Sequence, residues 1–507
     1  MSRLRRNVSA NVLANVWSTV LALVLVPVYV ARLGIESYGL VGFYMSWVAI
    51  MGIVDTSLST TALRETAWLS ARPAERGRIP SLLRTLEVTY WIAMSVFGVV
   101  LLCAAWWYGE TWFQVGSVPA ASVRDALMLM VVALTIQAPS GLYLGGLMGL
   151  QRQVEASGLV ATFGTLRGIG AVVVLWVFSP DIRVFFLWQI AASVVQTSLM
   201  RAVLMRATHV PGGPPPRFSV QMLMSVRQFA GATSVITALS LVLAQGDKMI
   251  LSRLVSLESF GYYTVAWTVA SGLSRVATPL LQAFSPRFTE LLSEGDLGAL
   301  GRQVRIASQL TNVLVLPPAA LLVIATAPVL TAWLGRSSVV AGATPLLAVL
   351  AAGTLLTACS YPALSVLYSK TRLMPVIVVN AVGVLLLLPL CAWAVVTFGA
   401  EGAAWCWALN GFLSYLVYQV IGLRDLNDAR LSVSVLRDFL PPAATSVVIA
   451  LLTSHWSTQV SGRLALAAVL SAGLIGGWLA AMIVCRDLGR MVVDTLRWRS
   501  IQTRMSP

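Results

Sequence analysis

Apolar stretches separated by short polar turns follow one another along the whole chain. Most of them hold about 20 residues or more, the length that an α-helix needs to cross the hydrocarbon core of a bilayer. They lie near residues 8–31, 39–60, 83–107, 122–147, 157–178, 182–204, 226–246, 259–284, 303–334, 340–368, 374–397, 400–423, 435–455 and 463–485. The pattern predicts an all-α integral membrane protein with about 14 transmembrane helices.

One of the polar turns occurs twice. The segment RLGIESYGLVGFYMSW, from Arg32 to Trp47, is echoed by RLVSLESFGYYTVAW, from Arg253 to Trp267. With one residue of slack, the matched pairs are Arg32 and Arg253, Leu33 and Leu254, Glu36 and Glu258, Ser37 and Ser259, and Gly39 and Gly261. An even number of predicted spans separates the copies, so both lie on the same membrane face. The chain is therefore expected to hold two parallel repeats, related by an axis along the membrane normal.

A proline-rich segment divides the two repeats. The stretch HVPGGPPPRF, residues 209–218, cannot be helical because proline lacks the amide donor and fixes its backbone angle. We expect an N-terminal six-helix lobe at 1–208, a cytoplasmic linker at 209–218 and a second six-helix lobe at 219–425. Residues 426–507 would then form two additional transmembrane helices and a basic cytoplasmic tail.

Composition and charge agree with a membrane protein. Charged residues make up 11% of the chain, against roughly 25% in soluble domains, and the mean hydropathy is +0.81. The formal charge of +15 is concentrated in every second loop, which by the positive-inside rule places both termini in the cytoplasm and argues against nucleic acid as a partner. The first apolar stretch is too long for a signal-peptide core and is expected to be a retained helix.

Residues that could perform covalent chemistry are few. The five cysteines all lie in apolar stretches, without the spacing of a disulfide framework or a metal site. The two histidines, His209 and His455, fall in the linker and at the end of a span, and there is no phosphate-binding loop of the GxxxxGK[ST] type. We therefore expect a carrier and not an enzyme, with no cofactor and no metal.

Three arginines are candidates for substrate contact. Arg167 lies about ten residues into the fifth span, roughly 15 Å deep, where its side chain cannot reach water. Such a charge costs about 2.5–3.5 kcal/mol and usually faces a cavity or a partner. It is expected either to bind phosphate or sugar or to cap carbonyls between packed helices. Arg275, in the eighth span, has the same two interpretations, and Arg64 is either a substrate contact or an interfacial anchor.

Polar residues near the span ends and along two helices complete the candidate set. Asp55, Asp247 and Lys248 are possible ion-coupling groups; the alternatives are a helix cap for Asp55 and a solvated helix edge for Asp247 and Lys248. Polar stripes occupy the first helix of each lobe, where they would either line a hydrated cavity that binds glycan hydroxyls or form interhelical hydrogen bonds. The stripes contain Asn7, Asn11, Asn15, Thr233, Thr237 and Ser240.

Several segments resemble polysaccharide exporters of the O-antigen flippase type. These are the turn from Arg32 to Gly39, MGIVDTSLSTTALRE at the end of the second span, the GLQRQ turn before the fifth span, and FGAEGAAWCWAL from Phe398 to Leu409. The family is part of the multidrug/oligosaccharidyl-lipid/polysaccharide exporter superfamily. The resemblance implies two six-helix bundles around a central cavity that opens to each side in turn. It also implies the substrate, an oligosaccharide on a polyprenyl diphosphate, destined for lipopolysaccharide O-antigen or exopolysaccharide in the bacterial inner membrane.

Two alternatives within the superfamily stay open: a multidrug/cation antiporter and a lipid II-type flippase. An antiporter for cations requires a carboxylate-lined cavity, whereas acids in the middle of the predicted spans are nearly absent. The expected partners are the lipid-linked oligosaccharide, membrane lipids and other polysaccharide assembly proteins. Coupling to protons, to sodium or to the membrane potential alone is left open.

Overall fold

The computed structural model describes residues 2–208, 215–370, 374–424, 426 and 434–485. Side chains are described for the same residues except 2–16, 53–57, 225–238, 240 and 434–436. The described chain is built from helices, and its one extended pairing is an isolated bridge between Gln114 and Ser256. The prediction of an all-α protein is confirmed, because each predicted apolar stretch contains a helix.

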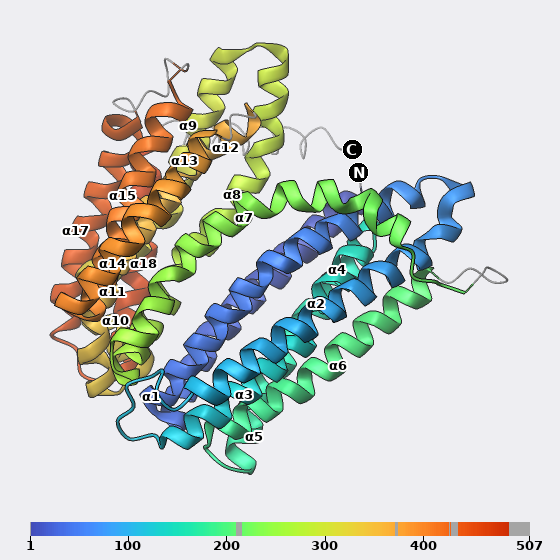
Figure 1. Ribbon diagram of the computed structural model, residues 1–507. Coiled ribbons are helices and arrows are strands. Elements are labelled where there is room, and N and C mark those ends of the chain that lie inside the picture. Colours follow the sequence, from blue (N-terminus) through green and yellow to red (C-terminus); the bar gives the residue numbers. More distant parts are fainter. Residues whose placement is uncertain (1, 209–214, 371–373, 425, 427–433, 486–507) are drawn as a thin grey trace, which may run out of the picture. The chain divides into compact units, whose positions relative to one another are not determined.

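The helices form two compact units, Met1–Gly261 and Tyr262–Pro507. Unit 1 (blue to green in Figure 1) contains α1 (Ser2–Ser70), the short η1 (Pro73–Arg78), α2 (Ile79–Tyr108), α3 (Ala120–Gln137), α4 (Ser140–Gly149), α5 (Gln153–Val177), α6 (Ile182–Thr208) and α7 (Val220–Leu254). Helix α7 packs along α1. The predicted linker falls largely on residues 209–214, outside the described chain, and the predicted lobe borders stay a prediction.

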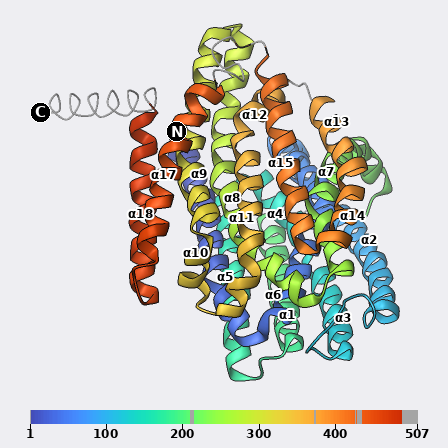
Figure 2. The same cartoon turned by 90° about the vertical axis from the view of Figure 1, so that its left-hand side faces the viewer.

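Unit 2 holds most of α8 (Leu257–Glu294) and the helices after it, which Figure 2 labels. These are α9 (Leu297–Ile324), α10 (Thr326–Leu334), α11 (Ser337–Cys359), α12 (Tyr361–Ser369), α13 (Met374–Val382), η2 (Gly383–Leu387), α14 (Leu388–Phe398), α15 (Ala400–Gly422), η4 (Ser434–Phe439), α17 (Leu440–Ser457) and α18 (Arg463–Val484). The two additional helices of the sequence prediction are α17 and α18, and both pack on α9.

Ten helical segments of the described chain are long and apolar enough to cross a membrane. The difference from the predicted fourteen has a simple origin. Trp17–Gly52 counts as one segment where the sequence predicts two spans, and α7, α8 and α15 are not among the ten. A multi-pass membrane protein is therefore established, while the number fourteen stays a prediction.

The first copy of the repeated turn is a sharp break inside α1. Gly34 adopts φ 80° and ψ 167°, a conformation that a residue with a Cβ rarely takes, and helical geometry resumes directly after it. In the second copy the helix is interrupted over one more residue: α7 ends at Leu254, Val255 is extended, and α8 starts at Leu257. This difference accounts for the one residue of slack between the two copies.

The two copies of the turn contact each other within unit 1. A Cβ on Gly39 would lie 2.9 Å from the carbonyl oxygen of Leu257, and a Cβ on Gly261 would collide with the backbone of Ile35. Glycine at the matched positions therefore permits a backbone contact that any larger residue would prevent. The repeat seen in the sequence corresponds to a reciprocal contact in space.

The loop between α2 and α3 binds both copies of the turn. The Glu36 carboxylate accepts hydrogen bonds from the Ser117 amide at 3.0 Å, the Ser117 hydroxyl at 3.0 Å and the Val118 amide at 3.0 Å. At the second copy, the Leu257 amide donates to the Gln114 carbonyl at 2.9 Å. We call the two turns and the loop at residues 109–119 the outer clasp.

The motif arginines extend this clasp. Arg253 donates to the carbonyls of Thr111 and Trp112, the latter at 3.0 Å, and its guanidinium lies 5.9 Å from the Trp112 ring centroid. Arg32 lies 3.5 Å above the ring of Trp176. Both copies therefore place their arginine over a tryptophan face, a favourable cation–π geometry.

The two ends of unit 1 differ in charge. The turn after α1, the turn between α4 and α5 and the end of α6 meet at one end, which carries Arg72, Arg76, Arg78, Arg84, Arg152 and Arg206. The outer clasp lies at the break inside α1, at the other end of the helical segment 35–70. Successive basic loops therefore gather at a single end, as the positive-inside pattern requires. We call it the basic end, and it is the side predicted to be cytoplasmic.

Replacing Glu36 with glutamine should loosen the outer clasp. The side-chain amide loses the charge that strengthens three hydrogen bonds and turns one acceptor oxygen into a donor facing amide N–H groups. We expect unfolding in detergent to become easier by about 1–3 kcal/mol, measured as a lower Tm. Glu258→Gln is the control, because Glu258 is the matched residue of the second copy and its side chain is exposed. An unchanged Tm for Glu36→Gln would show that the clasp does not stabilise the unit.

Candidate functional site

Arg167 lies near the middle of the 25-residue helix α5 and is held by side chains from three other helices. Its Nε donates to Gln196 Oε1 at 2.9 Å, and Nη2 donates to Ser193 Oγ at 3.0 Å, both on α6. Nη1 donates to Gln137 Oε1 of α3 at 2.7 Å and to the Tyr44 hydroxyl of α1 at 3.3 Å. Tyr44 in turn donates to the same Gln137 oxygen at 3.0 Å. This group is the Arg167 cluster.

The Arg167 cluster solvates the guanidinium of Arg167 without neutralising its charge. The partners of Arg167 among the described residues are side-chain amides and hydroxyls, so the positive charge has no counter-ion there. Four hydrogen bonds occupy four of the five N–H groups that a guanidinium carries. The side chain is half-buried. Arg167 thus fixes α1, α3, α5 and α6 together and still has one N–H available for a further acceptor.

Arg275 is in a different situation. Its side chain is exposed on α8, four residues before Pro279, and it makes no hydrogen bond or ion pair with any described residue. Arg64 lies 3.5 Å from the Glu65 carboxylate, with 52% of its side chain exposed. The structure therefore does not bring Arg64 and Arg167 into contact, and of the three predicted arginines Arg275 alone is left with an open guanidinium.

The Asp247–Lys248 pair corrects one sequence interpretation. The solvated helix edge is wrong, because the two residues are only 6% and 5% exposed and lie within α7, not at its end. Lys248 Nζ is 3.0 Å from Asp247 Oδ1 and also donates to the Ala244 carbonyl at 3.1 Å. Adjacent residues on a helix normally diverge, so a lysine that folds back onto its neighbour is an internally neutralised pair suited to burial.

The polar stripes cannot be placed. Asn11, Asn15, Thr233, Thr237 and Asp55 all have side chains outside the described part of the chain. Their predicted roles in glycan contact and ion coupling stay predictions.

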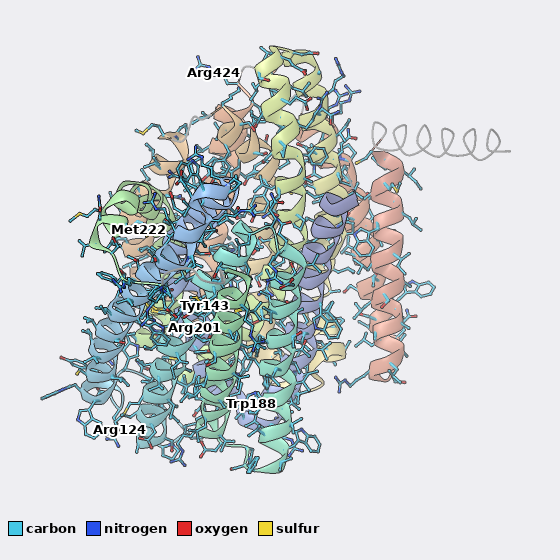
Figure 3. The ribbon with its side chains drawn as sticks, turned by 90° about the vertical axis from the view of Figure 1, so that its right-hand side faces the viewer. Arg124, Tyr143, Trp188, Arg201, Met222 and Arg424 are labelled. Atoms are coloured by element: carbon cyan, nitrogen blue, oxygen red, sulfur yellow. The ribbon has the colours of Figure 1, made fainter. Side chains whose placement is uncertain are left out.

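Glu87 is a buried group that sequence reasoning missed. It is 1% exposed on α2 and accepts hydrogen bonds from Arg84 at 2.8 Å, Arg201 at 2.5 Å and Tyr143 at 2.7 Å. Figure 3 labels Tyr143 and Arg201, which lie close together. The sequence signal is an acid early in an apolar stretch, three residues after Arg84. Its other two partners, Tyr143 and Arg201, are 56 and 114 residues away, so their pairing with Glu87 could not be read from spacing.

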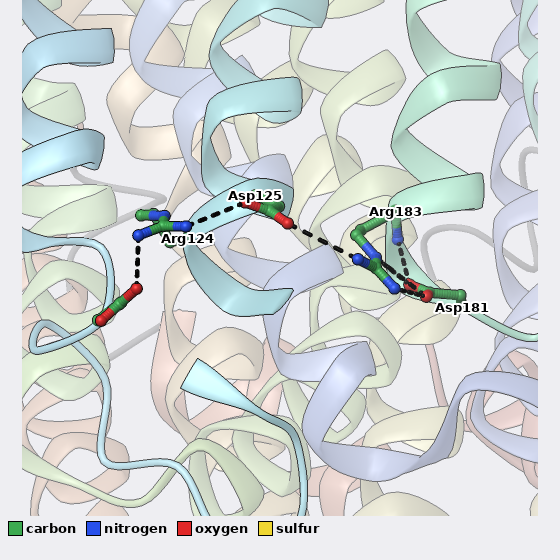
Figure 4. Close-up of polar contacts among 5 residues, drawn as sticks. Arg124, Asp125, Asp181 and Arg183 are labelled. Atoms are coloured by element: carbon green, nitrogen blue, oxygen red, sulfur yellow. Dashed lines mark hydrogen bonds and ion pairs between the residues drawn. The ribbon is translucent and has the colours of Figure 1, made fainter. Parts of the chain in front are cut away.

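The end of unit 1 opposite the basic end carries a chain of alternating charges. Arg124 contacts Glu110 at 2.6 Å and Asp125 at 3.7 Å, and Asp125 contacts Arg183 at 3.6 Å. Arg183 completes the chain with Asp181 at 2.7 Å (Figure 4). Hydrogen bonds from Arg183 hold the pKa of Asp181 below its ordinary value. Charges at this end thus alternate in sign, whereas arginine predominates at the basic end.

The fold is that of a known class of membrane transporters. Along 94% of this chain and 98% of the other, it is similar to the lipid II flippase MurJ in an inward closed conformation, with a TM-score of 0.73 and 12% identity. It is also similar to an inward-facing multidrug resistance MATE family transporter of the MOP superfamily, over 80% of this chain and 94% of the other, with a TM-score of 0.66 and 11% identity. The expectation of a carrier and not an enzyme agrees with this class.

Residues 4–292 match the family described as polysaccharide biosynthesis protein, and the chain belongs to that family. It is 25% identical over 343 residues to the uncharacterized membrane protein EpsK of Bacillus subtilis (strain 168). That alignment covers 65% of each protein, so the chain spans slightly less than two thirds of this relative. The resemblance seen in the sequence motifs is confirmed at the level of the family.

Replacing Arg167 with lysine should weaken unit 1 even though the charge is kept. An ammonium has three donors on one atom and cannot reach Tyr44, Gln137, Ser193 and Gln196 together. We expect a loss of about 1–3 kcal/mol of stability, measured as a lower Tm in detergent. The control is Arg206→Lys, on the same helix as Ser193. Arg201→Lys is not suitable as a control, because it disturbs Glu87. A normal Tm with lost activity would show that Arg167 acts on the substrate and not on the helices.

Proposed function

We propose that this protein is a flippase. It carries an oligosaccharide on polyprenyl diphosphate, an O-antigen or exopolysaccharide repeat unit, from the cytoplasmic to the outer leaflet of a bacterial inner membrane by alternating access. Both termini are cytoplasmic in this proposal. The observation that carries it is the state of the span cations: Arg167 is surrounded by neutral groups and Arg275 has an open guanidinium, so neither charge is neutralised by a described residue.

A net positive charge within the spans suits a diphosphate. Each arginine at mid-membrane depth costs about 2.5–3.5 kcal/mol on insertion scales, so an uncompensated one is a functional hypothesis by default. A guanidinium binds phosphate oxygens through two parallel hydrogen bonds, which gives it an advantage over lysine at such a site. We assign the diphosphate first to Arg275, which is open, and second to the remaining N–H of Arg167. Arg64 is proposed as an additional contact at the basic end.

The buried acids argue against a cation as the substrate. Among the described residues the buried acids are Glu87, Asp247 and Asp438. Glu87 binds two arginines, Asp247 binds Lys248, and Asp438 accepts a hydrogen bond from Gln309 at 2.8 Å. A cationic drug would have to displace one of these partners. The multidrug antiporter alternative is therefore less favoured than a flippase, and a lipid II-type substrate differs from our proposal only in the glycan.

The membrane potential supplies a driving force. Moving one negative charge outward, down an inside-negative potential of 100 mV, releases about 2.3 kcal/mol, and a diphosphate carries about two charges. The buried Asp247–Lys248 pair and Asp55 are the candidate groups for ion coupling, and the polar stripes with Asn11, Asn15, Thr233 and Thr237 are the candidate glycan contacts.

The outer clasp gives alternating access a defined step. Helices α1 and α7 are the first helices of the two predicted repeats. At the outer clasp, the two copies of the repeated turn contact each other through their backbones and are both bound by the loop at residues 109–119. If the repeats separate on this side to release the glycan, the hydrogen bonds that join the second copy of the turn to the loop must break, from the Leu257 amide to Gln114 and from Arg253 to Thr111 and Trp112. We propose that the clasp holds the outer side closed in the conformation described here.

Arg275 is expected to be required for transport and not for folding. In a strain that lacks the chromosomal copy, polyprenyl-linked glycan should accumulate in the inner leaflet and the wild-type gene should restore export. Arg275→Gln should lower export at least about tenfold because one charge-assisted contact is lost, while Arg275→Lys keeps part of it. Arg287→Gln, further along α8 and paired with Glu290 at 2.6 Å, is the matched control. Full export by Arg275→Gln at equal protein level, or only sensitivity to cationic drugs in the deletion strain, would contradict the proposal.

A disulfide across the outer clasp should stop transport reversibly. Gln114 and Ser256 are paired in a bridge, which brings their Cα atoms within about 5 Å, a separation that a disulfide spans. The double variant Gln114→Cys and Ser256→Cys should therefore cross-link under oxidation, lose transport and recover it with a reductant. Each single variant, treated identically, controls for the native cysteines. Undiminished transport by the cross-linked protein would mean that the clasp never opens.

A further inference from the structure

A cavity of about 660 Å³ opens at the basic end of unit 1. Its walls come from four places in the chain: the end of α1, η1 with the start of α2, the turn between α4 and α5, and the end of α6. The lining residues include Ser70, Arg76, Gln151, Arg152 and Thr208. The volume lies within the range of about 300–1,000 Å³ typical of small-molecule sites.

The charged groups on the cavity wall are two arginines. Arg76 donates through Nε to the Ser70 carbonyl at 2.8 Å, and its two Nη groups make no hydrogen bond or ion pair with described residues. Arg152 is paired with Glu155, with Nη2 2.7 Å from the carboxylate, and its Nη1 is not used in that contact. Glu155 is not part of the wall, so the lining carries positive charge without a lining carboxylate.

The shape of the wall is fixed by the backbone. Helix α4 ends with the Arg152 amide donating to the Leu147 carbonyl at 3.0 Å and the Gln151 amide donating to Met148 at 3.0 Å, which is the Schellman arrangement. The position that takes a left-handed conformation there is normally glycine, but here it is Gln151 with φ 59°. A non-glycine residue in this conformation is strained, and such strain is concentrated at functional sites.

The remaining wall is apolar and comes from residues near the ends of spans. It includes Ala67, Ala71, Ile79, Leu150 and Ala207. The positive-inside rule explains why these loops carry arginine, but it does not explain a cavity or a guanidinium whose terminal nitrogens have no acceptor among the described residues. A group with an anionic oxygen and an apolar portion matches both parts of the wall.

We propose that this cavity binds the phosphate headgroup of an anionic phospholipid of the cytoplasmic leaflet. Arg76 contributes the terminal guanidinium nitrogens, Arg152 Nη1 and the Gln151 side chain supply further donors, and the alanine and leucine side chains contact the glycerol portion. None of the three arginines proposed to contact the substrate lines this cavity, so the site does not depend on the proposed substrate. The protein would then be held at the cytoplasmic surface by one specific lipid.

The test is lipid binding by the purified full-length protein, measured by native mass spectrometry with phosphatidylglycerol or phosphatidylcholine. We expect phosphatidylglycerol to bind more tightly, and Arg76→Gln to weaken that binding about tenfold, the effect of losing a charge-assisted contact. Arg78→Gln is the matched control, because Arg78 carries the same charge nearby, pairs with Glu75 at 3.6 Å and does not line the cavity. The control should change binding less than about twofold.

A second variant separates shape from charge. Ala71→Trp fills the cavity from its apolar wall and should weaken phosphatidylglycerol binding with all arginines intact. Equal losses in Arg76→Gln and Arg78→Gln, no preference between the two lipids, or normal binding by Ala71→Trp would each overturn the proposal. So would displacement of the bound lipid by millimolar inorganic phosphate with no dependence on the acyl chains, which would identify a soluble phosphate as the ligand. Transport activity of the same variants is not the readout, so failure here leaves the proposed function untouched.

Discussion

The hydrocarbon core of a membrane offers no water to a charged side chain, and the protein has to supply the missing solvation. This constraint explains how the buried ions of the chain are arranged. Glu87 is surrounded by Arg84, Arg201 and Tyr143, and Asp247 is neutralised by its own neighbour Lys248. Each of these groups is matched with an opposite charge, as buried ions usually are.

Arg167 and Arg275 depart from that rule in two ways. Arg167 donates four hydrogen bonds to neutral side chains, which solvate the ion and leave its charge in place. Arg275 donates none to the described residues. A positive charge that a protein keeps within its spans without a counter-ion is free to attract an anion, and the family of polysaccharide biosynthesis proteins to which the chain belongs gives that anion a natural identity in our proposal. The duplicated turn contributes the second element, a close backbone contact between α1 and the start of α8.

Much of the fold could be predicted because its signals are local. Helix positions follow from apolar runs, the outer turns follow from their repetition, and the basic end follows from the distribution of arginine. The break at Gly34 was predicted as a turn, but the sequence could not show that one non-helical residue is enough to form it. Nor could it show that the matched glycines, Gly39 and Gly261, allow the two turns to contact each other.

The site was harder because its contacts are remote in sequence. Arg167 could be singled out as an unusual charge, but its partners Tyr44 and Gln137 are 123 and 30 residues away and are ordinary residues in apolar stretches. Glu87 was missed for the same reason. The solvated helix edge predicted for Asp247 and Lys248 was wrong, because two adjacent charges normally diverge around a helix whereas both of these side chains are buried.

The central claim is that the uncompensated span cations carry an anionic lipid headgroup. The most direct measurement uses the purified protein in liposomes and compares movement of a polyprenyl-diphosphate oligosaccharide between leaflets with uptake of a cationic dye, at the same imposed potential. The account predicts movement of the diphosphate lipid, faster when the receiving side is positive, and no transport of the dye. Dye transport without movement of the lipid would contradict it.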